Sequence, residues 1–131
     1  MVRPMAQEER ERRRSPRWTV ELAVAFRHLG RPDESHEDVV RNLSEGGVFI
    51  ETSVGLPLGT PLAIEVALED PPGRDVVTVE GEVVRVEWQV GRTGSTEERT
   101  ARGLAVAFVP GQERVVNRLL ARARARAGET S

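Results

Sequence analysis

The 131-residue sequence contains no cysteine, no lysine and no tyrosine. Without cysteine, the chain forms no disulfide, offers no thiolate ligand to zinc and has no thiol nucleophile. No apolar run reaches the roughly 18 residues that a membrane-spanning helix needs, and the charged first 17 residues lack the apolar core of a secretory signal. Because a cysteine-free chain also suits a reducing compartment, we expect a cytoplasmic protein without a membrane span.

Groupings of catalytic or metal-ligating residues are also missing. The sequence around the two histidines, His28 and His36, contains no nucleophile-elbow serine motif and no spacing typical of metal ligands. Acidic residues flank His36, but a solvated charged loop explains that group better than a metal site does. Neither of the common phosphate-binding glycine motifs occurs. We therefore expect a protein that is not an enzyme and needs no metal or cofactor.

The charge is unevenly distributed along the chain. All 19 basic residues are arginine, against 21 acidic residues. Residues 1–17 hold six Arg and three Glu, net +3, and residues 111–131 hold five Arg and two Glu, also net +3, so the central part is acidic. This distribution, and the absence of aromatic residues from both arginine-rich ends, argues against a surface that coats or stacks on nucleic acid.

Alternation of apolar and polar residues predicts strands over most of the chain. Residues 18–26 alternate cleanly, and shorter segments of the same kind are 37–43, 47–52, 62–69 and 104–108. Residues 75–88 form a longer strand whose apolar face switches between Gly81 and Val84, which indicates a β-bulge or bend. Because such bends let a small sheet close on itself, we expect an all-β fold, a six-stranded antiparallel β-barrel.

The spacing of apolar residues becomes helical from about 111 to 126. It predicts a C-terminal amphipathic α-helix whose apolar stripe covers a mouth of the barrel. Residues 91–103 are polar and have no apolar anchor, so they are predicted to be a mobile loop. A disordered arginine-rich arm at 1–12 and a disordered tail at 127–131 are expected to flank a single domain at 13–126.

Two polar segments carry recognition chemistry. The first is Arg12-Arg13-Arg14-Ser15-Pro16-Arg17, and the second is Asn42-Leu43-Ser44-Glu45-Gly46-Gly47. A guanidinium stacks on a base and also forks onto phosphate oxygens or the guanine edge. Asn42 and Ser44 share one face of a strand and both donate and accept hydrogen bonds. Gly46 and Gly47 permit positive φ and close backbone approach. Taken alone, the first segment is typical of a solvated tail and the second of a hairpin turn.

Together, and in this order on an all-β pattern, the two segments resemble the PilZ domain family. That family carries an RxxxR element at the start of the domain and a [D/N]xSxxG element further along, which residues 13–17 and 42–47 match. The resemblance covers roughly residues 10–125. It implies a bacterial binding module for the second messenger cyclic di-GMP. It also implies that Arg13 and Arg17 contact guanine and phosphate, Asn42 and Ser44 hold a guanine edge, and Gly47 permits the close turn.

The neighbours Arg12, Arg14 and Gly46 are accessory candidates for the same ligand site. Because residues 1–17 carry a net charge of +3 and repel one another, we expect this arm to be mobile without ligand. The two phosphates would neutralise Arg13 and Arg17 and fold the arm across the barrel end, which would relay the signal to a partner protein. Two alternatives remain open: a nucleotide-independent protein–protein adaptor on the same fold, and a nucleic-acid-binding protein that uses its arginine-rich ends.

A second row of arginines recurs every four residues in the predicted helix: Arg114, Arg118, Arg122 and Arg126. Residues at this spacing line up on one helix face. The row is interpreted as a solvated face docked on the acidic body, with contact to an acidic partner or nucleic acid as the alternative. For the whole protein we expect a monomer or a weak dimer.

Overall fold

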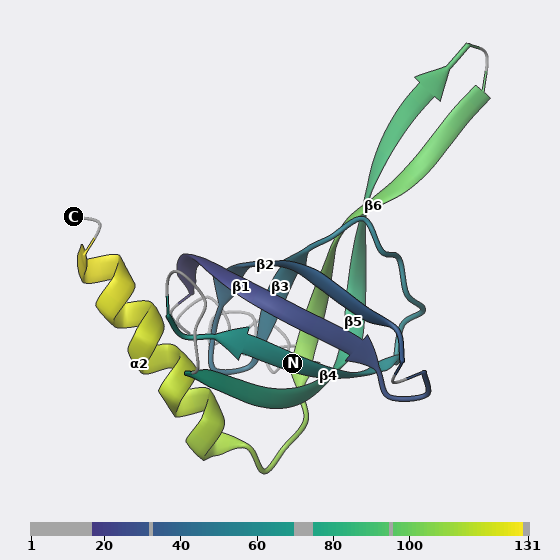
Figure 1. Ribbon diagram of the computed structural model, residues 1–131. Coiled ribbons are helices and arrows are strands. Elements are labelled where there is room, and N and C mark those ends of the chain that lie inside the picture. The colour runs from purple at the N-terminus through teal and green to yellow at the C-terminus, as the bar shows by residue number, and fades with distance from the viewer. Residues whose placement is uncertain (1–16, 32, 70–74, 95, 130–131) are drawn as a thin grey trace, which may run out of the picture.

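The computed structural model describes residues 17–31, 33–69, 75–94 and 96–129 (Figure 1). The predicted Arg-rich arm and the last two residues of the predicted tail lie outside these ranges. The elements in chain order are β1 (Trp18–His28), β2 (Ser35–Leu43), β3 (Gly47–Glu51), β4 (Pro61–Ala67), β5 (Val76–Thr93), β6 (Thr96–Phe108) and α2 (Glu113–Glu129).

The six strands form a closed barrel in the order β1-β2-β3-β6-β5-β4, and every neighbouring pair is antiparallel. The predicted fold, all-β with six antiparallel strands and a C-terminal helix, is confirmed. Alternation explains the interior: Val20, Leu22, Val24 and Phe26 of β1 are all buried, while the residues between them face outward. One buried apolar cluster fills the barrel.

The predicted irregularity in β5 is present. The β5–β6 register shifts between Val83 and Arg85, so one extra residue enters β5 there. Val83 is 1% exposed, whereas Val84 is 49% exposed. The shift therefore leaves both Val84 and Arg85 on the outer surface of the barrel, where they line the pocket described below.

The prediction of a mobile loop at 91–103 is wrong, because this segment belongs to two strands. β5 continues to Thr93 and β6 starts at Thr96, and their pairing runs without a break from Trp88 and Ala101 to the tip. Figure 1 shows this hairpin projecting away from the barrel. Polar composition indicates the lack of a buried face, but a two-stranded ladder needs only backbone hydrogen bonds and a turn, which Gly94 makes at φ 65°.

The helix α2 packs on the barrel through contacts with β1 and β5. Its apolar stripe (Val116, Leu119, Leu120 and Ala123) belongs to the same buried cluster as the strand interiors, so the helix covers that core. The side chain of Gln112, which precedes α2, ties the helix to β5, since it accepts from the Glu80 N–H at 2.6 Å and donates to the Glu80 carbonyl at 2.7 Å. The helix runs to Glu129, beyond its expected end at about 126.

The arginine row of α2 is partly docked on the acidic body. Arg118 forms an ion pair with Asp75 at 2.8 Å. The side chain of Arg126 lies outside the described residues. Among the described residues, no helix combines the length and the apolar character needed to cross a membrane.

Candidate functional site

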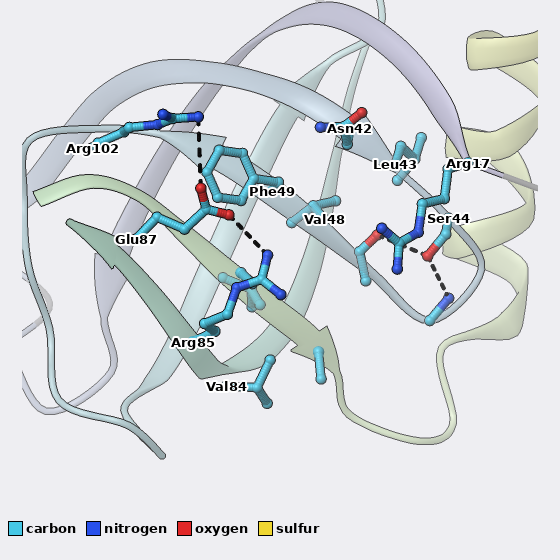
Figure 2. Close-up of a pocket in the computed structure, with 15 residues that line it drawn as sticks. Arg17, Asn42, Leu43, Ser44, Val48, Phe49, Val84, Arg85, Glu87 and Arg102 are labelled. Carbon is cyan, nitrogen blue, oxygen red and sulfur yellow. Dashed lines mark hydrogen bonds and ion pairs between the residues drawn. The ribbon is translucent and has the colours of Figure 1, made fainter. Parts of the chain in front are cut away.

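A pocket of about 560 Å³ opens on the outer surface of the barrel, where β2, β3, β5 and β6 meet the start of β1 (Figure 2). Its polar lining comes from Arg17, Asn42, Ser44, Arg85, Glu87 and Arg102. Three arginines against one glutamate give this lining a net charge of +2, although the whole chain carries −2. The pocket is therefore suited to an anionic ligand.

The structure brings the predicted site residues together. One pocket is lined by residues of both motifs, although the motifs are well separated in the sequence. They are Arg17 and, from the turn between β2 and β3, Asn42, Ser44, Gly46 and Gly47. Antiparallel pairing of β1 with β2 explains the meeting, because Trp18, next to Arg17, lies opposite Leu43. Arg13, with Arg12 and Arg14, lies outside the described residues.

Ser44 holds the turn between β2 and β3. Its N–H donates to the Gly47 carbonyl at 2.9 Å. Its hydroxyl accepts from the Gly46 N–H at 3.3 Å and donates to the Gly47 carbonyl at 3.5 Å. A serine hydroxyl has one donor and two acceptor lone pairs, so one lone pair is left to accept a hydrogen bond from a ligand. Ser44 thus closes the turn and keeps one acceptor available for a ligand.

Gly47 is needed for close packing rather than for an unusual backbone angle. A Cβ at this position would collide with the carbonyl oxygen of Val106 on β6. The positive φ that glycine permits is not used at Gly46 or Gly47, because in the described ranges the glycines with positive φ are Gly59, Gly94 and Gly111. The turn needs no left-handed residue because the Ser44 side chain closes it, and the Gly46 carbonyl accepts from the Phe108 N–H at 2.9 Å.

Asn42 and Arg17 present unoccupied polar groups to the pocket. Both are exposed, and neither side chain has a hydrogen-bond or ion-pair partner within the described part of the chain. Arg41, which precedes Asn42, forms ion pairs outside the pocket with Glu51 at 2.9 Å and Glu21 at 3.4 Å. The hydrogen bond to Glu51 is the main cause of a raised pKa at Arg41.

Sequence reasoning missed three charged residues at the other end of the pocket. The Glu87 carboxylate accepts from Arg85 Nη2 at 2.9 Å, and its second oxygen lies 3.6 Å from Arg102 Nη2 (Figure 2). Arg85 and Glu87 are two apart on a strand, a spacing that places both on one face and was visible in the sequence. Arg102 was not predictable in this way, because its direction depends on a register shift opposite Glu87 and Trp88.

An apolar floor separates the two polar ends. Phe49 lies on the outer side of β3, between the buried residues Val48 and Ile50, and its ring covers Gly103 of β6 so closely that a Cβ there would collide with it. Figure 2 shows Phe49 between Asn42 and the Glu87 carboxylate. A flat apolar surface between basic groups fits a ligand that has both rings and negative charges. No cluster of three or more His, Asp or Glu that could hold a metal occurs in the residues that the structure describes.

Comparison with solved structures finds the same fold. The PilZ domain of YcgR from Escherichia coli, solved with c-di-GMP, aligns with a TM-score of 0.65 and 21% identity over 91% of this chain and 96% of that one. The PilZ domain of CeSA from a cellulose-synthesizing bacterium aligns with a TM-score of 0.56 and 20% identity, covering 80% and 94% respectively. MrkH of K. pneumonia in its apo state gives 0.60 and 16%, covering 91% and 53%.

Sequence comparison gives the family. No curated protein sequence matches the chain significantly. The family model of the PilZ domain, however, matches residues 11–123, which include both motifs, all six strands and most of α2. The chain therefore belongs to the PilZ domain family.

Proposed function

We propose that this chain binds cyclic di-GMP in the pocket and relays the presence of the messenger to a partner protein. The observation that carries the proposal is the convergence of Arg17 with Asn42, Ser44 and Gly47 on one basic pocket. Family membership supports it, as does the YcgR PilZ domain, which was solved with c-di-GMP.

The chemistry of the pocket matches the parts of the ligand. Cyclic di-GMP has two phosphates and two guanines. The exposed guanidinium of Arg17 can fork onto a phosphate or stack on a base. The amide of Asn42, which is not used within the described chain, can bond the guanine edge, and the spare lone pair of Ser44 can accept from a guanine N–H. Phe49 gives the ligand an apolar floor.

The proposed relay uses the arm that precedes β1. Arg17 lines the pocket and is followed directly by Trp18, the first residue of β1, so the arm leaves the barrel at the rim of the pocket. On this proposal Arg13 closes over the ligand from the arm, with Arg12 and Arg14 in support. Ordering of the arm would change the surface that a partner contacts.

Calorimetric titration with cyclic di-GMP tests the binding. The unsubstituted protein should bind, whereas Arg17→Ala and Arg13→Ala should abolish binding without unfolding the barrel. Arg92→Ala is the matched control, because Arg92 is exposed on the projecting hairpin, outside the pocket. Unchanged affinity in both arm variants would overturn the assigned site. No binding by the unsubstituted protein would leave a nucleotide-independent adaptor as the better account.

A further inference from the structure

We propose that Arg85 and Arg102 form a second phosphate-binding position, and that Glu87 is a built-in competitor which the ligand phosphate displaces. This inference rests on the proposed function and extends it to the end of the pocket that lies outside both family motifs. It concerns three residues on β5 and β6 whose side chains, within the described residues, make polar contacts only with one another.

The geometry supports a shared anion position. The two oxygens of the Glu87 carboxylate face different guanidiniums, Arg85 at 2.9 Å and Arg102 at 3.6 Å. A phosphate also offers oxygens that guanidinium groups fork onto. Glu87 therefore occupies the place between two cations where a phosphate of the ligand would make its strongest contacts.

The register of β5 and β6 explains how the three charges meet. The shift between Val83 and Arg85 leaves Arg85 on the outer face of β5, and Glu87 follows two residues later on the same face. A second shift lies opposite Glu87 and Trp88, where β6 carries the unpaired Arg102 between Ala101 and Gly103. Ala101 and Gly103 are buried, whereas Arg102 is exposed and its guanidinium reaches Glu87. Both bulges therefore direct arginine side chains, Arg85 and Arg102, toward the pocket.

Exposure decides between a competing and a supporting role for Glu87. The side chains of Arg85 and Arg102 are 64% and 62% exposed, so their ion pairs with Glu87 add little to stability. Each guanidinium has five N–H donors, most of which remain available to a ligand. The Glu87 side chain, at 34% exposure, is more shielded, and its carboxylate repels an incoming phosphate at close range. Its charge therefore weakens binding more than its contacts assist it.

The direct test is Glu87→Gln, which removes the charge and keeps a carbonyl oxygen that accepts from Arg85. Calorimetry should give a cyclic di-GMP Kd about three- to tenfold lower than that of the unsubstituted protein at low salt, with a smaller gain at high salt. Arg85→Ala and Arg102→Ala should each raise Kd. The controls are Glu65→Gln, an exposed glutamate on β4, and Arg92→Ala, both outside the pocket.

The outcomes separate this inference from the proposed function. If Arg17→Ala abolishes binding while the variants at 85, 87 and 102 bind like the unsubstituted protein, the competitor role is refuted and the messenger site stands. Weaker binding by Glu87→Gln would also refute competition, since it would make Glu87 a positioning residue. If cyclic di-GMP does not bind at all, the proposed function fails. Titration with inorganic pyrophosphate then still tests whether Arg85 and Arg102 bind phosphate in competition with Glu87.

In that titration, the side-chain NMR signals of Arg85 and Arg102 should move further in Glu87→Gln than in the unsubstituted protein. Equal movement in the two proteins would contradict the inference independently of the messenger. The same signals should also shift when cyclic di-GMP binds to the unsubstituted protein.

Discussion

Replacing Gly47 with alanine tests whether close packing of β3 on β6 builds the site. The added Cβ would collide with the carbonyl oxygen of Val106, and Gly47 itself pairs with Ala107 in the ladder. A backbone oxygen cannot rotate away as a side chain does, so one strand must move. Overpacking of this kind costs about 1–3 kcal/mol, and the displaced strand carries the turn that positions Ser44.

Gly46 supplies a matched control one residue away. A Cβ there would meet only the Ser44 hydroxyl oxygen at 3.9 Å, which is ordinary contact. Gly46→Ala should therefore change the free energy of unfolding by less than about 1 kcal/mol. Urea denaturation followed by circular dichroism measures both variants. If Gly47→Ala and Gly46→Ala unfold at the same urea concentration, the reasoning about close approach is refuted.

Three further predictions concern the core, the helix and the ligand. Leu119→Ala should lower the free energy of unfolding by about 2–5 kcal/mol because Leu119 is fully buried, whereas Leu58→Ala, at 68% exposure, should change it by less than about 0.5 kcal/mol in the same melts. Arg118→Ala should cost less than about 1 kcal/mol, because its ion pair with Asp75 is largely solvent-exposed, and a double-mutant cycle measures this. Asn42→Asp should tighten cyclic di-GMP binding in calorimetry, because a carboxylate accepts from two guanine donors where an amide has one acceptor oxygen; weaker binding would contradict this account of position 42.

The sequence was sufficient to predict the barrel because its local signals agree with one another. The alternation in β1, the change of face after Gly81 and the helical spacing around Leu119 each predict the element that the structure contains. These signals are hydrophobic patterns that report burial, and burial is what closes a small barrel around one core.

The missed features depend on pairing rather than on burial. The hairpin beyond Trp88 buries almost nothing, so its strands leave no apolar pattern to read. Arg102 reaches the pocket only because the β5–β6 register shifts near it, and a shift of one residue turns a side chain to the opposite face. Half of the site could therefore be predicted from the motifs, while the end with Arg85, Glu87 and Arg102 required the register.

The central claim is that the pocket between Arg17 and the Ser44 turn receives cyclic di-GMP and that the arm then folds over it. Backbone NMR during a titration with the nucleotide tests both parts at once. We expect the amide signals of Arg17, Asn42 and Ser44 to shift together, and the signals of residues 10–16 to gain the dispersion of an ordered segment. If saturating nucleotide leaves all of these signals unchanged while the barrel remains folded, the account is contradicted.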